Sequence, residues 1–134
     1  MNIAHIGLIV TDLNRAAQFY EGILGLSRTA RPELAFEGIW YGLAAGQQIH
    51  LMLLHNPYAD SKKPAHGGRD NHVALHTDAF DAIRQRLDTA RISYSMSQSG
   101  RTALFCRDPD GNTIELIQAA AVSDDLPSGG DCRR

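Results

Sequence analysis

Residues 108–117 read DPDGNTIELI, and this stretch decides the fold. Its first four residues form a strong turn signal, because Pro109 presets its own φ angle and Gly111 tolerates a positive one. The residues that follow alternate as in a β-strand, so Glu115 lies on the face opposite its two apolar neighbours. A carboxylate inside an apolar strand is unfavourable to bury unless a metal ion or another partner compensates its charge. Glu115 is therefore the first residue that needs an explanation.

The same pattern occurs in the first half of the chain. Residues 45–52 align without a gap on residues 110–117, at an offset of 65, so that His50 falls on Glu115. Both segments place a glycine in the turn and a polar side chain at the same point of the strand. Imidazole and carboxylate are both common metal ligands, so the match concerns chemistry as well as shape.

A second pair of segments repeats in the same way. Residues 5–8 match residues 72–75 at an offset of 67, and each segment begins with a histidine, His5 or His72. An aspartate and a helical pattern follow in both cases. The chain is thus an internal repeat, which predicts two copies of one supersecondary unit. Each copy places potential metal ligands at two equivalent positions.

Each copy has the periodicity of one strand, one helix and three further strands. In the first copy we expect strands over residues 2–10, 26–29, 36–43 and 48–55, with a helix over residues 13–24 capped by Thr11 or Asp12. In the second copy we expect strands over residues 71–77, 92–96, 102–107 and 112–118, with a helix that starts at Asp78 or Asp81. The two copies therefore predict the same order of elements.

The predicted fold class is α+β, with one domain over residues 1–119 made of two βαβββ modules. The modules span residues 1–55 and 71–119. The connector, residues 56–70, is rich in proline, glycine and charge, which predicts no regular element there. Residues 120–134 have the composition of a flexible tail.

The composition excludes several classes of protein. The 134 residues are 43% hydrophobic and 21% charged, which is typical of a soluble globular domain. A net charge of -2 argues against a nucleic-acid partner or an acidic membrane surface. No apolar run approaches the length of a membrane span. Cys106 and Cys132 are expected to be free thiols, so we predict a cytoplasmic protein.

The four repeated positions predict a metal site. His5, His50, His72 and Glu115 have the opposite strand parity to their apolar neighbours, so all four should line the face away from the helices. Three imidazoles and one carboxylate suit zinc, nickel, iron, cobalt or manganese, and the sequence leaves the choice open. Four protein ligands leave two positions of an octahedral site for a small substrate that binds through oxygen atoms.

At this point the chain resembles the vicinal oxygen chelate superfamily, which includes glyoxalase I, extradiol dioxygenases, fosfomycin thiol transferases and bleomycin-binding proteins. The resemblance covers residues 1–119. It rests on His5 with Thr11-Asp12-Leu13 and Phe19-Tyr20, Leu24-Gly25-Leu26, Ile49-His50-Leu51, Asn71-His72-Val73-Ala74-Leu75, Asp108-Pro109-Asp110-Gly111 and Ile114-Glu115-Leu116. It implies paired modules, an open eight-stranded barrel-like sheet with the helices outside, and one divalent metal in the cleft.

The resemblance also implies a function. We expect a small, metal-dependent member similar to glyoxalase I, with lactoylglutathione lyase-like isomerase or lyase chemistry and glutathione or another thiol as a possible cosubstrate. Glu115 matches the carboxylate that serves that enzyme as ligand and base, so it is the predicted catalytic residue. Relatives of this length usually form homodimers, and the metal site is then shared between subunits or lies within one chain.

One departure from the pattern leaves the reaction open. Bacterial glyoxalase I has a glutamate where this chain has His50. Without His50, the set of His5, His72 and Glu115 is the ligand pattern of an extradiol dioxygenase, with His76 and Tyr94 as possible supporting residues in that reading. A third alternative is a bleomycin-type binding protein without catalytic activity, although such relatives typically lack the ligand set.

Several other positions have weaker interpretations. Trp40 and Phe105 occupy equivalent strands, where they could pack in the core or form walls of a pocket, and core packing is the favoured role for both. Arg101 precedes a strand and could bind an anionic part of a substrate, although a solvated arginine is the default. His66 is expected to face solvent. Arg91 stands where many relatives have a glycine after the second helix.

Overall fold

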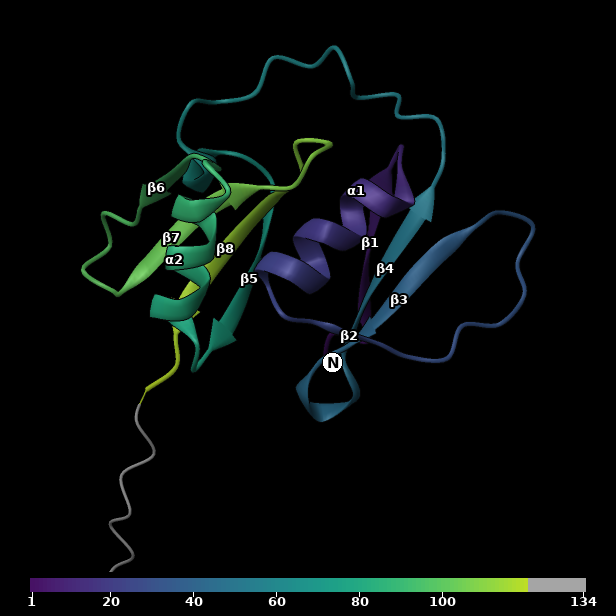
Figure 1. The fold of residues 1–134 in the computed structure, drawn as a ribbon, viewed down its shortest axis with the longest axis horizontal. Coiled ribbons are helices and arrows are strands. Elements are labelled where there is room, and N and C mark those ends of the chain that lie inside the picture. The colour runs from purple at the N-terminus through teal and green to yellow at the C-terminus, as the bar shows by residue number, and fades with distance from the viewer. Residues whose placement is uncertain (121–134) are drawn as a thin grey trace, which may run out of the picture.

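The computed structural model describes residues 1–120, which form two βαβββ modules joined by an arching connector (Figure 1). The first module contains β1 (His5–Val10), α1 (Leu13–Ala17), η1 (Gln18–Ile23), β2 (Ser27–Arg28), β3 (Gly38–Gly42), η2 (Ala44–Gly46) and β4 (Gln48–Leu53). The second contains β5 (His72–Thr77), α2 (Phe80–Thr89), β6 (Tyr94–Met96), β7 (Ala103–Arg107) and β8 (Thr113–Gln118). The tail predicted over residues 120–134 lies almost entirely outside the described residues, as does Cys132.

The strands form two open sheets of four, in the orders β1-β4-β3-β2 and β5-β8-β7-β6. In each sheet the first and last strands of the module, β1 with β4 and β5 with β8, run parallel, and all other neighbours are antiparallel. This arrangement confirms the α+β class and the paired modules. The eight strands are divided between two curved sheets and do not close into one barrel.

The two modules have the same strand register. Gly7 lies opposite His50 in the first sheet, and Ala74 lies opposite Glu115 in the second. These pairs are the ones that the two sequence offsets superimpose, so the repeat in the sequence is a repeat in the structure. His50 and Glu115 consequently hold equivalent places on their sheets.

The first helix begins as predicted, whereas the start of the second helix and the connector differ from expectation. Asp12 caps α1 as predicted, and its carboxylate accepts a hydrogen bond from the backbone of Arg15 at 3.0 Å. The second helix is capped by neither predicted aspartate. Its N-cap is Ala79, whose backbone N–H donates a hydrogen bond to the Thr77 hydroxyl at 3.0 Å. The connector, expected to be irregular throughout, contains a single 3₁₀ turn, η3 (Gly67–Arg69).

Arg91 adopts a backbone conformation that usually favours glycine. Its φ angle is +56°, directly after the C-terminal cap of α2. Gly25 has a φ of +75° at the equivalent point after the first helix. An L-residue at such an angle is strained, which explains why glycine is the usual choice there.

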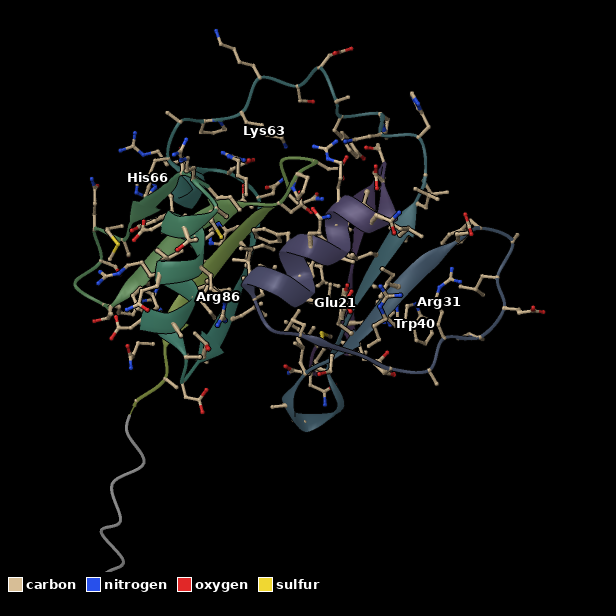
Figure 2. All side chains as sticks on the ribbon, viewed as in Figure 1. Glu21, Arg31, Trp40, Lys63, His66 and Arg86 are labelled. Carbon is tan, nitrogen blue, oxygen red and sulfur yellow. The ribbon has the colours of Figure 1, made fainter. Side chains whose placement is uncertain are left out.

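One hydrophobic core serves both modules, because each sheet packs its apolar face against the helical layer. Its largest fully buried side chains include Tyr20, Ile49, Leu87 and Leu116. Figure 2 shows Arg86 reaching from α2 toward the end of η1, where its Nε donates to the carbonyl of Ile23 at 2.8 Å. Packing between the helices therefore joins the two halves of the chain.

The turn at residues 108–111 also joins the modules. The Tyr20 hydroxyl donates to Asp108 Oδ2 at 2.7 Å, and the amide of Asn112 donates to the carbonyl of Ile9 at 2.9 Å. Burial raises the pKa of Tyr20 and of Asp108, because water no longer stabilises their charged forms. The modules thus meet through helices and this turn, and the opposite faces of the sheets carry the predicted ligands. Within residues 1–120, no helix has the length and apolar character needed to cross a membrane.

Candidate metal centre

Glu115 is buried on the face of the second sheet that lies away from the helices. Its side chain is only 5% exposed, and its two oxygen atoms contact different partners. Oε2 lies 3.2 Å from His72 Nε2, and Oε1 lies 3.4 Å from Nη2 of Arg101. The carboxylate that is unfavourable to bury therefore lies between one imidazole and one guanidinium, and the guanidinium of Arg101 supplies the compensating positive charge.

A backbone hydrogen bond fixes the orientation of His72. Its Nδ1 lies 2.8 Å from the carbonyl of Asp70, and a carbonyl can only accept, so Nδ1 carries the proton. In the neutral ring, Nε2 then presents its lone pair to Glu115. Metal-binding histidines are typically held in this way, with the second ring nitrogen bonded to a carbonyl or carboxylate.

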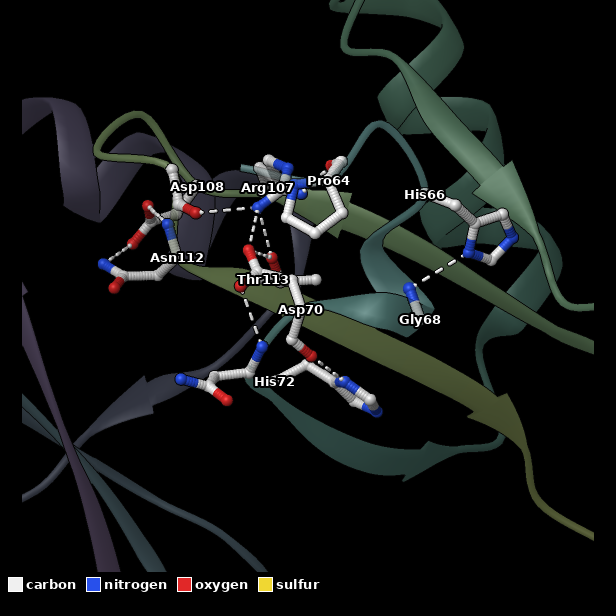
Figure 3. Close-up of polar contacts among 11 residues, drawn as sticks. Pro64, His66, Gly68, Asp70, His72, Arg107, Asp108, Asn112 and Thr113 are labelled. Atoms are coloured by element: carbon white, nitrogen blue, oxygen red, sulfur yellow. Dashed lines mark hydrogen bonds and ion pairs between the residues drawn. The ribbon is translucent and has the colours of Figure 1, made fainter. Parts of the chain in front are cut away.

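Asp70 is itself held by a network of hydrogen bonds around Arg107 (Figure 3). Arg107 Nη1 donates to Asp70 Oδ2 and to the Thr113 hydroxyl, each at 2.6 Å, while Nη2 donates to the carbonyl of Pro64 at 2.7 Å. The hydrogen bond from Arg107 lowers the pKa of Asp70. Arg107 therefore ties the connector to β7 and β8 just before His72.

In the second module, the distance between His72 and Glu115 suits two ligands of one metal ion. A nitrogen lone pair facing a carboxylate oxygen needs a cation between them, either a proton or a metal. Metal–nitrogen and metal–oxygen bonds of about 2.0–2.2 Å at right-angled or tetrahedral geometry separate the two ligand atoms by about 2.9–3.4 Å. The observed 3.2 Å between His72 Nε2 and Glu115 Oε2 lies within that interval.

The first module brings its two histidines together differently. The rings of His5 and His50 stack with centroids 4.0 Å apart and planes 16° apart. Trp40 stacks on His50, at 3.8 Å and 2°. Imidazole lone pairs lie in the ring plane, so two stacked rings do not converge on one cation as placed here.

His50 also makes a polar contact that defines its ring. Its Nε2 lies 2.7 Å from Gln48 Oε1, an acceptor, so Nε2 carries the proton and Nδ1 is the nitrogen free to bind a cation. Burial, with smaller contributions from His5 and Arg31, lowers the pKa of His50. The lowered pKa favours the neutral form of the His50 ring.

The structure brings the four predicted ligands together as two pairs, His5 with His50 and His72 with Glu115. Within residues 1–120, no cluster of three or more histidine, cysteine, aspartate or glutamate side chains is placed to hold a metal ion. Each pair lies on a different sheet. A four-ligand site therefore needs the two open faces to be brought together.

Several residues around the site were misjudged or missed from the sequence. Trp40 lies outside the core and stacks on His50, whereas Phe105 is buried as expected and lies edge-on to His72 with centroids 5.2 Å apart. Asp70 and Gln48 were not singled out, although each lies two residues before a predicted ligand and shares its strand parity. That parity is the one signal that could have identified them.

The two proposed supporting residues, Tyr94 and His76, lie on opposite edge strands of the second sheet, β6 and β5. Tyr94 pairs with Cys106 in the sheet, and its hydroxyl donates to Asp88 at 2.9 Å, so it does not contact the Glu115 carboxylate. His66 is partly buried, contrary to expectation, and its ring lies 5.2 Å from that of Phe105. His76 follows His72 by two pleats on the same strand, where it borders a separate cavity of about 290 Å³.

A cavity of about 530 Å³ opens between β1, β5 and the connector. His72 contributes to its wall, as do Lys62 and Lys63, whereas Glu115 does not. The space beside His72 is thus large enough for a small molecule.

The family model described as the glyoxalase/bleomycin resistance protein/dioxygenase superfamily matches residues 2–116. A lactoylglutathione lyase of Haemophilus influenzae is 30% identical over 135 residues, which cover 94% of this chain and 98% of that protein.

Solved structures have the same fold. A glyoxalase/dioxygenase from Nostoc punctiforme has a TM-score of 0.69 at 23% identity, covering 90% of this chain and 92% of that one. A mutant fosfomycin resistance protein from Listeria monocytogenes, solved with manganese(II), has a TM-score of 0.65 at 21% identity, covering 89% and 92%. Taken together with the family match over nearly the whole described chain, these similarities mean that the chain belongs to the glyoxalase/bleomycin resistance protein/dioxygenase superfamily.

Proposed function

We propose that this chain is a divalent-metal-dependent enzyme with lactoylglutathione lyase-like isomerase or lyase chemistry. The observation that carries the proposal is the pairing of the buried Glu115 carboxylate with His72, whose free nitrogen lies 3.2 Å from Glu115 Oε2. Similarity to a lactoylglutathione lyase at 30% identity supports the reaction class. Zinc, nickel, cobalt, iron and manganese all suit the donor set.

We further propose a homodimer in which His5 and His50 of one subunit and His72 and Glu115 of the other hold the metal. Two observations support this arrangement. Each chain carries two separate ligand pairs, and the described residues contain no complete cluster. His5 and His72 are both exposed on the open faces of their sheets, where a second copy can reach them.

Once bound, the metal supplies Lewis acidity to two oxygen atoms of a small substrate. The residues of this chain then have distinct roles. Glu115 is the general base, because it is the only carboxylate of the ligand set, and it accepts a proton from the substrate carbon next to the bound oxygens. The stacked face of Trp40 and the edge of Phe105 exclude water from the reacting atoms. Glutathione or another thiol is the proposed cosubstrate.

The test is turnover by metal-loaded protein. Cobalt-, nickel- and zinc-loaded samples are assayed with methylglyoxal and glutathione, with Glu115→Gln as the inactive control. Activity in the wild type that is lost in the variant supports the proposal. Stoichiometric metal uptake without turnover would contradict the reaction. No metal uptake at neutral pH would contradict the whole proposal and favour a binding protein.

One observation favours a second candidate, an extradiol-type dioxygenase that uses His5, His72 and Glu115. His50 is engaged by Gln48 and by the face of Trp40, so it can act as a wall of the site without binding metal. Iron(II)-loaded protein that consumes oxygen with catechols, and not methylglyoxal with glutathione, would establish this alternative.

A further inference from the structure

Arg101 places a positive charge at the candidate metal centre. It lies in the connection between β6 and β7, and its Nη2 is 3.4 Å from Glu115 Oε1. The side chain is 58% exposed, whereas that of Glu115 is 5% exposed, so the guanidinium covers the carboxylate from the open side. The only other hydrogen bond from its side chain within residues 1–120 runs from Nε to the Ser99 hydroxyl, at 3.3 Å.

The guanidinium is compatible with a cation at the His72 side of the carboxylate. Glu115 faces His72 with Oε2 and Arg101 with Oε1. A cation bound between His72 and Glu115 Oε2 therefore does not displace Arg101 from Oε1. The remaining N–H groups of the guanidinium are then available to a molecule bound at the centre, and their fork geometry suits a carboxylate or a similar oxyanion.

The other module also carries an arginine on its ligand face. Arg31 lies in the connection between β2 and β3, which is equivalent to the β6–β7 connection that holds Arg101. Its Nε lies close to Gly38, 3.1 Å from the position that a Cβ atom would take on this glycine. Gly38 precedes Trp40 by two residues in β3, so Arg31 occupies the same face as the Trp40–His50 stack. Its Nε is buried and has no hydrogen-bond partner among residues 1–120.

These positions determine the charge of the centre. The imidazoles are neutral ligands and Glu115 supplies one negative charge, while each loop supplies an arginine and the metal supplies two positive charges. Positive charge exceeds negative charge before any substrate binds. In a partly buried site such an excess favours an anionic ligand over a neutral one of the same shape.

We propose that Arg101 selects a substrate that carries a carboxylate or comparable oxyanion at or beside its metal-binding oxygens, as in a 2-hydroxy or 2-oxo acid. The inference rests on the metal centre of the proposed function, and it names a substrate class other than the methylglyoxal–glutathione adduct, which has no carboxylate beside its metal-binding oxygens. It assigns to Arg101 a role in specificity that differs from its role as counter-ion of Glu115.

The test compares metal and anion binding in Arg101→Gln, with cobalt(II) measured by calorimetry and visible absorption. The probes are glycolate and glycolamide, which have the same shape and differ in charge. Loss of the guanidinium should raise cobalt affinity about 3- to 10-fold, because a cation beside a metal ligand is removed from a partly exposed site. It should lower glycolate affinity by about 10-fold and leave glycolamide binding unchanged.

The opposite signs separate this role from a structural one, in which cobalt, glycolate and glycolamide binding would all fall together. Arg28→Gln is the matched control. Arg28 pairs with Glu21 at 2.9 Å and is 56% exposed, and it should leave all three affinities unchanged. Arg101→Lys, which keeps the charge, should restore most of the glycolate affinity.

Three results would overturn the inference. Glycolate affinity in Arg101→Gln equal to that of the wild type, with cobalt bound in both, would refute it and leave the proposed function intact. A parallel loss of all three ligands would make Arg101 structural. A wild-type protein that takes up no cobalt would refute the proposed function, and the inference with it.

Discussion

The two modules share one backbone plan and use it for different chemistry. Gly7 faces His50 in the first as Ala74 faces Glu115 in the second. In the first module the ligand pair consists of two imidazoles held in a ring stack with Trp40. In the second it is a buried carboxylate and an imidazole, each fixed by hydrogen bonds or ion pairs.

This difference assigns separate roles to equivalent positions. The second module presents a lone pair and a carboxylate oxygen at a separation that suits a metal ion, whereas the stacked rings of the first must rotate before both can bind one. The second module should therefore dominate metal affinity, and the first should adjust it. Five predictions test this comparison, beginning with the loss of Glu115.

Glu115→Gln should abolish metal binding with little change in fold, because the amide has the same shape and no charge. We expect metal affinity to fall by more than about 100-fold, beyond the 10- to 100-fold loss typical of residues that only support a ligand. Calorimetric titration with cobalt or zinc measures this effect. Glu33→Gln, an exposed carboxylate, is the control. A variant that retains wild-type affinity would remove Glu115 from the metal centre.

His50→Ala should weaken metal binding by about 10-fold, less than loss of Glu115, because His50 is a neutral ligand and must first leave its stack. Trp40 is the only tryptophan, so its fluorescence reports on the stack directly. Metal should change Trp40 emission in the wild type and not in His50→Ala. Equal metal affinity in both proteins would leave a three-ligand site of dioxygenase type.

His50→Glu extends the same comparison. The variant should keep the fold and the metal, because the position lies on the open face and the metal compensates the new charge. It should also shift activity toward the glyoxalase reaction, since it restores the second carboxylate of that pattern. Turnover of methylglyoxal with glutathione below the wild-type rate would contradict this expectation.

Arg107→Met should reduce metal affinity by about 3- to 10-fold, because Asp70 loses its anchor and His72 its fixed orientation. Arg86→Met is the matched control, since it breaks a hydrogen bond between the modules and touches no ligand. Both variants should melt at lower temperature, and only Arg107→Met should change metal affinity. Equal metal affinities in the two variants would show that the network serves stability alone.

The last prediction concerns two buried side chains on the helix side of the sheets. Tyr41 and Cys106 are equivalent in the repeat, and burial raises the pKa of both, that of Cys106 to about 12. A thiol whose pKa rises on folding stabilises the native state below pH 9 and loses that contribution as pH rises toward 12. Wild-type stability should therefore fall relative to Cys106→Ala over that interval, by up to about 1.4 kcal/mol per pH unit. Parallel pH profiles from chemical denaturation would contradict this.

Much of the fold could be predicted from the sequence because it depends on local patterns. The repeat offsets predicted the equivalent registers of β1 with β4 and β5 with β8, and strand parity predicted that the candidate ligands lie on the faces away from the helices. The first helix cap at Asp12 followed from its side chain. The N-cap of the second helix could not be predicted in this way. The Thr77 hydroxyl, which the preceding strand positions, accepts the hydrogen bond from the Ala79 N–H in place of an Asp78 or Asp81 side chain.

The sequence by itself therefore determined the two-module plan, the identity of the four candidate ligands and the special place of Glu115. Only the tertiary structure decided how those ligands are held: the stack of Trp40 on His50, the carbonyl of Asp70 on His72 and the guanidinium of Arg101 on Glu115. Strand parity is fixed by the backbone and is visible in any short segment. The direction of a ring or a guanidinium is fixed by neighbours that only the folded chain brings together, because side-chain rotamers are selected by packing.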